Sequence, residues 1–270
     1  MNRWNAIVVK DLLNVGEIEG RVYIGRNYSV SNSHQFGFKL TKNVTSDIVF
    51  ASGGTVTTNG QANIKVFYGS AAVASAVANR AWFQFMQSGG ALSAPSTWAA
   101  DNSPVAAITS AAVYWRTLTP NSTAQIPSGQ PGPLKLICSE TEPVAVFNLT
   151  DVQTFENRNT QQIELKTSNA TKTIIINIKS IDGNVDWSSS NMVSQFNQEY
   201  WQCRTIWNFY TDANNGDMGT ISMNGNFKGA LVAPTATVTT NSNIDGALVC
   251  EYLNIQSEVH NPGGGWSGDA

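Results

Sequence analysis

Short runs of alternating hydrophobic and polar residues, separated by glycine, asparagine or aspartate, follow one another along much of the chain. Residues 19–25 (EGRVYIG) and 64–69 (IKVFYG) are runs of this kind, and each ends at a glycine. Residues 53–60 (GGTVTTNG) place a threonine-rich run between glycines. Alternation over so few residues, bounded by turn-forming residues, is typical of short β-strands. The pattern therefore predicts a mainly β protein.

Two further segments predict strands of a different character. Residues 171–178 (TKTIIINI) form a strongly β-branched run bounded by polar clusters. An apolar run of this kind predicts a central strand that is buried on both faces. Residues 207–210 (WNFY) are also predicted to form a strand.

A short internal repeat indicates how these strands are arranged. The string Gly-Ala-Leu-Val occurs at Gly229 and again at Gly246, 17 residues later. Between the two copies lie a threonine-rich run, 235–240, and a turn-rich segment, 241–243. A coil of a parallel β-helix has about this length, and its corners accept positive φ angles. We therefore predict an irregular parallel β-helix, or solenoid, in which corner asparagines can stack into ladders.

One segment has a helical rather than a β periodicity. In the alanine-rich run 71–86, larger or core-type residues recur every four positions, at Val73, Val77, Ala81 and Phe85. This spacing predicts a helix over about residues 71–87, packed alongside the solenoid. A second short helical piece is expected after Ser93, with Pro95 in its first turn, and residues 106–115 are expected to form a strand.

Composition and charge narrow the class of protein. Charged residues make up only 13% of the 270 residues, and asparagine, threonine, serine and glycine take their place, which weighs against a helical fold. The net charge is −3 and no lysine or arginine cluster occurs, so we expect no nucleic-acid partner. We predict a single domain over residues 1–262 and a flexible C-terminal tail, the glycine-rich 263–270.

The N-terminus and the cysteines bear on localisation. The longest apolar run near the N-terminus is 6–9, so no secretory leader and no membrane insertion are predicted. Cys138, Cys203 and Cys250 are widely spaced and odd in number, without a CxxC motif, which argues against zinc bound by cysteine. They leave two alternatives open, one disulfide with a free thiol or three buried unpaired thiols.

Two stretches resemble a known family. The first is residues 11–25 (DLLNVGEIEGRVYIG) with the serine-containing run after it, and the second is the ending 227–261, with its two Gly-Ala-Leu-Val blocks and EVHN. Together they resemble the choice-of-anchor A family, in order from residue 11 to 261, although 100–165 matches least. Glu17 stands where that family usually has Asp, and Arg26 replaces a Gly. The resemblance implies an adhesin-like β-solenoid, related in fold to ice-binding β-helix proteins.

Few residues offer catalytic chemistry. The two histidines are His34 and His260, and His260 lies in the segment 258–261 (EVHN), where a glutamate and an imidazole are close together. No nucleophile-elbow, zinc-protease or phosphate-binding motif occurs. We therefore favour a hydrogen-bonding role for His260 in the last coil. We predict that the protein is not an enzyme and has no catalytic residue, no cofactor and no metal.

Two acidic segments have alternative explanations. Glu17 and Glu19 alternate with Arg21 on one strand face, and local ion pairs are favoured over acid–base chemistry or cation binding. Residues 182–186 (DGNVD) have oxygen donors at alternating positions, as calcium loops do, but lack the remaining spacing and the final glutamate. A tight turn is the favoured interpretation.

Threonines in two segments suggest a binding face. Thr55 and Thr57, and likewise Thr237 and Thr239, share one side of a strand because they are two residues apart. Arrays of this kind can order water or contact sugars, although exposed threonines are also common in strands.

The prediction for function is a non-catalytic surface or structural protein that mediates adhesion, or coat or fibre assembly, through its solenoid. One alternative is an ice- or glycan-binding module, and a second is a polysaccharide-acting hydrolase. The expected partners are the protein itself, other coat or surface proteins, a glycan or the extracellular matrix. The expected location is extracellular, at the cell surface, or on a virion or coat.

Overall fold

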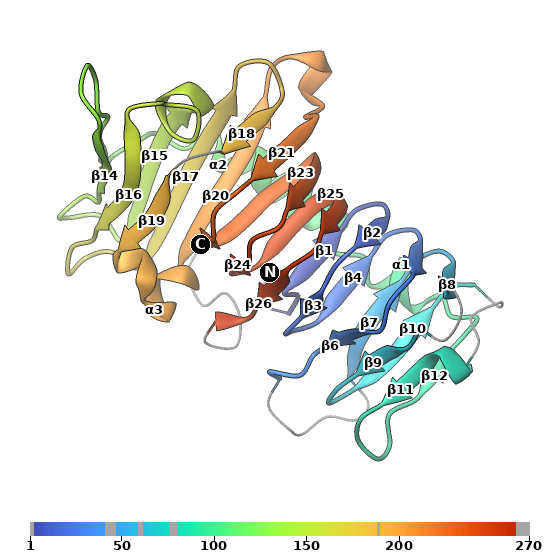
Figure 1. Ribbon diagram of the computed structural model, residues 1–270. Coiled ribbons are helices and arrows are strands. Elements are labelled where there is room, and N and C mark those ends of the chain that lie inside the picture. Colours follow the sequence, from blue (N-terminus) through green and yellow to red (C-terminus); the bar gives the residue numbers. More distant parts are fainter. Residues whose placement is uncertain (1–2, 41–46, 59–61, 76–79, 188–189, 263–270) are drawn as a thin grey trace.

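The chain forms a parallel β-solenoid whose two halves meet in the middle, as a computed structural model shows (Figure 1). The structure describes residues 3–40, 47–58, 62–75, 80–187 and 190–262. Strand β1 (Ala6–Val8) pairs on one side with β4 (Val22–Ile24) and on the other with β25 (Leu248–Ile255). From β1 the chain winds outward to β12 (Leu92–Ser93), crosses to β15 (Val144–Thr150) at the opposite end, and winds back to β25. The first coil therefore stacks on the last.

Three faces surround the core, and each is a row of stacked strands. The helix-covered face contains β12, β10 (Ser70–Val73), β7 (Ile48–Ser52), β4, β1, β25, β23 (Ala230–Thr240), β20 (Thr205–Thr211), β17 (Thr173–Ser180) and β15. The polar face contains β18 (Val185–Trp187), β21 (Thr220–Met223), the ends of β23 and β25, β2 (Leu12–Asn14), β5 (Tyr28–Val30) and β8 (Val56–Thr58). The charged face contains β11 (Phe83–Phe85), β9 (Ile64–Val66), β6 (His34–Phe36), β3 (Glu17–Ile18), β26 (Glu258–His260), β24 (Ile244–Asp245) and β22 (Phe227–Lys228).

A four-stranded sheet continues the charged face at one end. It contains β13 (Thr123–Gln125), β14 (Gly132–Ile137), β16 (Thr160–Lys166) and β19 (Asn191–Ser194). Among the described strands, β13 and β14 make an antiparallel pair and the other pairs are parallel. Short helical turns connect the coils: η1 (Arg80–Trp82), η2 (Asp151–Gln153), η3 (Gln195–Asn197), α3 (Glu199–Gln202) and η4 (Asn214–Gly216).

The interior is filled by the inward side chains of every strand. Each half of the solenoid has an aromatic cluster in its core, and the two clusters are Tyr28, Phe36, Phe50 and Phe83 in one half, and Phe155, Trp187, Trp207, Phe209 and Phe227 in the other. Within the first cluster the rings of Phe36 and Phe50 cross at 64°, with centroids 5.2 Å apart. Edge-to-face contacts of this kind add to the hydrophobic stabilisation from burial.

The predicted repeat is confirmed, because the segment between Gly229 and Gly246 makes one coil of the solenoid. Strands β23 and β25 pair in parallel, with Leu231 opposite Leu248. A Cβ atom on Gly246 would lie 2.1 Å from the Gly229 carbonyl oxygen. Only glycine therefore fits where these two corners stack. The predicted strands at 171–178 and 207–210 are confirmed as β17 and β20, and β17 is almost entirely buried.

The prediction of a helix alongside the solenoid is correct, but its predicted position is wrong. The helix is α2 (Val105–Trp115), preceded by the short α1 (Trp98–Asp101), and residues 106–115 are therefore not a strand. Within 71–87 the structure has β10, η1 and β11, and residues 76–79 lie outside the described part. The short helical piece expected after Ser93 is confirmed as α1, although Pro95 precedes it.

A second hydrophobic cluster lies between the sheet and the helices. On α2 the buried residues are Ile108, Ala112 and Trp115, which lie on one side of the helix. They pack on the outer side of the helix-covered face, where Ala51 and Val249 belong to the same cluster. Strand β10 is buried on both sides, which favours small residues. Its alanines serve strand packing rather than helix formation.

Cys138, Cys203 and Cys250 are all free and buried, so the structure contains three unpaired thiols. The extent of the domain over 1–262 remains a prediction, and the predicted tail, 263–270, lies outside the described residues.

Candidate functional site

The polar face is a sheet of seven strands in the order β18, β21, β23, β25, β2, β5 and β8. Strands in a sheet lie about 4.8 Å apart, so the face is roughly 30 Å wide. Its inward residues, such as Ile221 and Val238, are buried in the core. Because side chains alternate, the residues between them point outward.

The outward residues of neighbouring strands lie in register and form rows. Most carry a hydroxyl or an amide, and the paired positions are Thr220–Thr237–Tyr252, Asp186–Ser222–Thr239–Asn254 and Ser29–Thr57. Strand β2 is irregular between Leu12 and Asn14, and there Leu13 is 51% exposed. The rows therefore present a regular polar surface that is interrupted at its middle strand.

The structure brings the two predicted threonine segments onto the same face. Thr237 and Thr239 lie on β23, whereas Thr57 lies on β8 and Thr55 directly precedes it. The sequence did not indicate that Ser222 and Asn254 belong to this surface. Their strands show the same alternation, but only the stacking order of the coils places them beside the threonines.

Charged and aromatic side chains interrupt the polar face near its centre. The Lys10 ammonium lies 2.5 Å from a Glu251 carboxylate oxygen, and an Arg26 guanidinium nitrogen lies 2.6 Å from Asp11. Both cations lie near the ring of Tyr252, at 5.3 and 5.9 Å from its centroid. Ion pairs this exposed contribute little to stability. They place charged groups among the hydroxyls and amides of the face.

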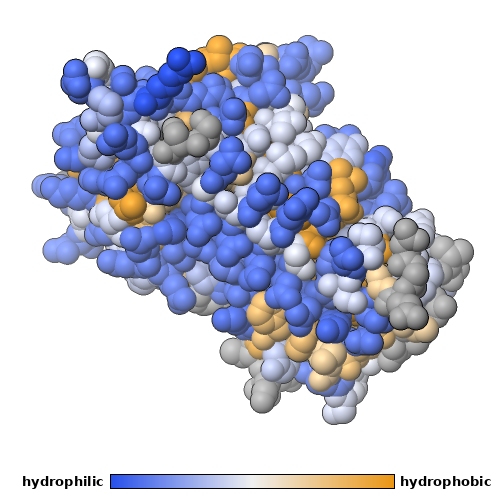
Figure 2. Space-filling model, in the orientation of Figure 1, coloured by the Kyte–Doolittle hydropathy of each residue, from blue (hydrophilic) through white to orange (hydrophobic). Residues whose placement is uncertain are grey.

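A polar groove separates the polar face from the charged face. Its volume is about 930 Å³. Its lining is rich in amide and hydroxyl groups, and the residues whose side chains are polar are Asn14, Glu17, Ser31, Asn32, Ser33, His34, Asn243, Gln256, Ser257 and Glu258. In Figure 2 the side of the molecule shown is mostly hydrophilic, with scattered hydrophobic patches.

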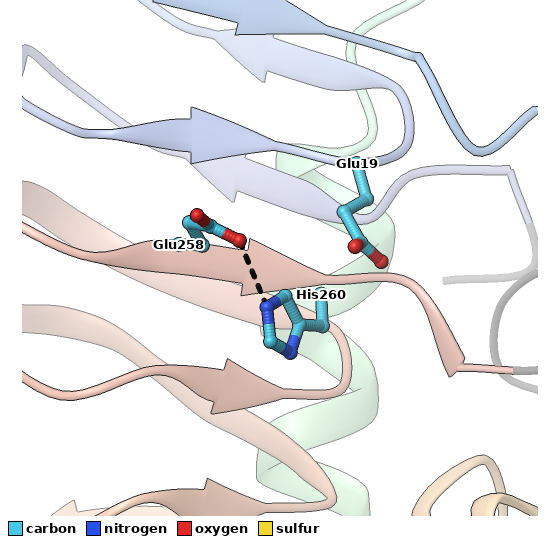
Figure 3. Close-up of side chains that lie close together, drawn as sticks. All are labelled: Glu19, Glu258 and His260. Atoms are coloured by element: carbon cyan, nitrogen blue, oxygen red, sulfur yellow. Dashed lines mark hydrogen bonds and ion pairs between the residues drawn. The ribbon is translucent and has the colours of Figure 1, made fainter.

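A charged cluster lies on the charged face, where β24, β26 and β3 are neighbours (Figure 3). His260 Nδ1 is 2.6 Å from a carboxylate oxygen of Asp245, and Nε2 is 3.0 Å from one of Glu258. Glu19 directly follows β3, which pairs with β26 on the side opposite to β24, and its side chain points toward His260. The hydrogen bonds expected for His260 are therefore confirmed.

The neighbours of His260 change its protonation. The hydrogen bond with Asp245 is the largest influence, and it raises the pKa of His260 to about 9. Partial burial opposes this rise, whereas Glu258 and the charge of Glu19 support it. In the absence of other cations, the imidazole is therefore protonated at neutral pH.

The predicted ion pairs of Arg21 with Glu17 and Glu19 are wrong. Arg21 forms an ion pair with Asp47 instead. Glu17 accepts a hydrogen bond from the Gln35 side chain. Glu19 accepts one from the backbone N–H of Asn261, 2.8 Å away, because the last coil stacks beside the first.

The predicted tight turn lies at residues 182–184, and Asp186 belongs to strand β18. The Asp182 carboxylate accepts a hydrogen bond from the backbone N–H of Asn184, and Gly183 has a φ of 94°. The side-chain oxygen of Asn184 in turn accepts one from the backbone N–H of Thr220. One side-chain oxygen of Asp182 and that of Asn184 are thus used within the solenoid, whereas Asp186 is exposed on the polar face.

The fold is that of a parallel β-solenoid that presents one broad polar face. The sequence matches the family described as "Putative Ice-binding-like adhesive domain" over residues 1–261. The chain therefore belongs to this family of adhesive domains. The finer assignment to choice-of-anchor A remains a prediction.

Other comparisons add little. No curated protein matches the chain. One similar solved structure is "Crystal structure of an ice binding protein from an Antarctic Biological Consortium", with 12% identity, covering 96% of this chain and 86% of that chain, at a TM-score of 0.34. Similarity at this level carries no argument about function. Among the described residues, no helix is long and apolar enough to cross a membrane.

Proposed function

We propose that this protein is a non-catalytic adhesive domain that works outside the cell or at its surface, and that it binds glycan-coated or similarly polar surfaces through the polar face. The observation that carries the proposal is the registered rows of outward hydroxyl and amide groups on the four adjacent strands β18, β21, β23 and β25 and on the pair β5 and β8. Groups fixed on a sheet lose little conformational freedom when they bind. Membership of an adhesive-domain family supports the same function.

The chemistry at the centre of the face favours a glycan. Tyr252 provides an aromatic ring, and Lys10 and Arg26 beside it provide hydrogen-bond donors. An aromatic ring can stack on the apolar side of a sugar, while amides and hydroxyls bind its hydroxyl groups. The adjoining groove, which Asn14, Asn32 and Gln256 help to line, has the same chemistry.

Ice binding is the second candidate, and one observation favours it. Thr220 and Thr237 are directly opposite each other on neighbouring strands, and so are Ser222 and Thr239. Hydroxyls spaced by a sheet form a regular two-dimensional array that can order water. The ion pair of Arg26 with Asp11 and the exposed Leu13 interrupt that array, so we rank ice second.

Assembly into fibres is less well supported than adhesion, because the strand edge at the β15 end of the solenoid is partly covered. An open strand edge there would invite pairing with another molecule. Asn121 instead donates its side-chain amide to the carbonyl oxygen of Val144, and its side-chain oxygen accepts from the N–H of Val146. The four-stranded sheet ends in the antiparallel strand β13. A coat or virion role stays a prediction.

The test is binding of the purified chain to immobilised polysaccharides and to ice. Thr57→Arg and Asn254→Arg change exposed positions of the polar face, and Gln162→Arg changes an exposed strand position on the four-stranded sheet. We expect the wild type and Gln162→Arg to be retained on at least one polysaccharide. The two polar-face variants should bind at least tenfold more weakly, with unchanged circular dichroism.

Two results would count against the glycan proposal. One is an absence of retention on every polysaccharide, and the other is an equal loss of binding in all three variants. Thermal hysteresis that Thr57→Arg and Asn254→Arg abolish would favour ice as the ligand.

A further inference from the structure

Three metal-ligating side chains from the two ends of the sequence meet on the charged face. One atom each from Glu19, Glu258 and His260 lies within 4.8 Å of the other two. Glu258 and His260 point the same way because they are two residues apart on β26, and Glu19 directly follows the neighbouring strand β3. Figure 3 shows the three side chains converging on one small region.

A fourth residue fixes the orientation of the imidazole. Asp245 lies on β24, the strand on the other side of β26, and its carboxylate oxygen is 2.6 Å from His260 Nδ1. A histidine that binds a metal through one ring nitrogen commonly donates its other N–H to a carboxylate, which fixes the tautomer and the ring plane. Here that contact directs Nε2 toward Glu258, 3.0 Å away.

The charges around this point favour a cation. Glu17 and Glu258 are directly opposite each other in register, an arrangement that is unfavourable for two like charges. Asp245 and Glu19 add two further carboxylates nearby. The Lys39 ammonium lies 3.9 Å from Glu19, but its side chain is 60% exposed and compensates only partly.

We propose that Glu19, Glu258 and His260 bind a divalent transition metal of the Zn²⁺ type. One imidazole nitrogen with two carboxylate oxygens is a donor set that suits zinc, and water can complete the coordination. Calcium fits poorly, because it prefers six to eight oxygen ligands. The sequence alone predicts no metal here, since Glu19 is more than 200 residues from the other two ligands.

The site has a metal-free state in which a proton on the imidazole replaces the metal. Protonated His260 then donates to both Asp245 and Glu258, and the cluster is a network of ion pairs. The two states differ in one respect that can be measured. Only the metal-bound state uses Glu19 and Glu258 as zinc ligands, so the measurable difference is the affinity for added zinc when a ligand is replaced.

The experiment uses the full chain, treated with a chelator and desalted, and titrates zinc chloride by isothermal calorimetry. We expect one ion per chain. His260→Gln and Glu258→Gln should each weaken binding at least tenfold, and Asp245→Asn should weaken it by about 10- to 100-fold through the orientation of His260. Glu251→Gln, on the polar face, is the matched control and should leave the affinity unchanged.

A second readout separates loss of binding from loss of folding. Zinc should raise the melting temperature of the wild type and of Glu251→Gln, because a ligand that binds only the folded state stabilises it. The variants in the cluster should melt cooperatively without zinc and show no such rise. The proposal is overturned if the wild type gives no heat with millimolar zinc, or if Glu258→Gln and His260→Gln bind as tightly as the wild type.

Discussion

The side-chain amide of Asn177 donates a hydrogen bond to the carbonyl oxygen of Trp115, 2.9 Å away. Trp115 is the last residue of α2, where backbone carbonyls have no partner within the helix. Asn208, on the next strand, binds the carbonyl of Ala112 in the same way, also at 2.9 Å. The sheet thus caps the end of the helix that crosses it.

These two asparagines belong to a ladder. Asn148, Asn177 and Asn208 are in register on β15, β17 and β20. Asn208 donates to the side-chain oxygen of Asn177 at 2.8 Å, and Asn177 donates to that of Asn148 at 2.9 Å. Each amide therefore serves both the sheet and, at two positions, the helix.

Replacing Asn177 with leucine should therefore destabilise the fold. The substitution removes one donor to the Trp115 carbonyl and the side-chain acceptor of Asn208 from a buried network, which costs about 1–3 kcal/mol. Urea unfolding should show this loss in the free energy of unfolding. Asn254→Leu, at an exposed position, should change it by no more than about 0.5 kcal/mol. Equal losses in the two variants would show that the ladder does not support the helix.

Stacking asparagines were predictable from the composition, but their place was not. We expected ladders at the corners, whereas this one lies in the middle of the helix-covered face. A β-branched run such as 173–178 predicts a buried strand, yet it does not show that a helix end lies above its one asparagine. That information depends on α2, which is far away in the sequence.

The order in which the coils stack could not be predicted from the sequence either. The repeat at Gly229 and Gly246 predicts that adjacent coils stack, because both copies lie in one half of the solenoid. Nothing local indicates that β1 pairs with β25, since that contact joins the two ends of the described chain. The cluster of Glu19 with His260 depends on this junction and was missed for the same reason.

Gly246→Ala should be strongly destabilising. The added methyl group would lie 2.1 Å from the Gly229 carbonyl oxygen, and a backbone atom cannot move aside as a flexible side chain can. We expect a loss of more than about 3 kcal/mol, or failure to fold. Gly132→Ala is the control, because its nearest contact would be 3.8 Å from the new methyl group. Thermal melts of both variants are the measurement, and similar melting temperatures would contradict the steric argument.

The three cysteines should be unreactive in the folded protein. Burial raises the pKa of the Cys203 thiol to about 11 and that of Cys138 to about 12, and the thiolate is the reactive form. Cys250 is fully buried, and its pKa is raised for the same reason. A chromogenic disulfide reagent at pH 8 should label all three thiols in denaturant and label them only slowly without it. Rapid labelling of the native chain, or fewer than three thiols in denaturant, would disprove this.

His34 should make the protein less stable as the pH falls. It is only 5% exposed, its Nδ1 is hydrogen-bonded to the Tyr28 hydroxyl, and burial lowers its pKa below the ordinary 6.5. Between the lowered pKa and 6.5 the unfolded chain therefore binds more protons than the folded one. The stabilisation from neutral His34 is complete above pH 6.5 and is lost as the pH falls through this window, by at most about 1.4 kcal/mol per pH unit.

The measurement is the free energy of unfolding from pH 7.5 to pH 5, for the wild type and for His34→Gln. The variant should lose stability at every pH, but its difference from the wild type should shrink as the pH falls. His260→Gln serves as the comparison, because the pKa of His260 is raised to about 9: the folded chain keeps this proton throughout the range while the unfolded chain gains it as the pH falls, a contribution opposite in sign to that of His34. The loss of stability as the pH falls should therefore be at least as steep in His260→Gln as in the wild type. A constant difference between wild type and His34→Gln would mean that His34 does not titrate differently on folding.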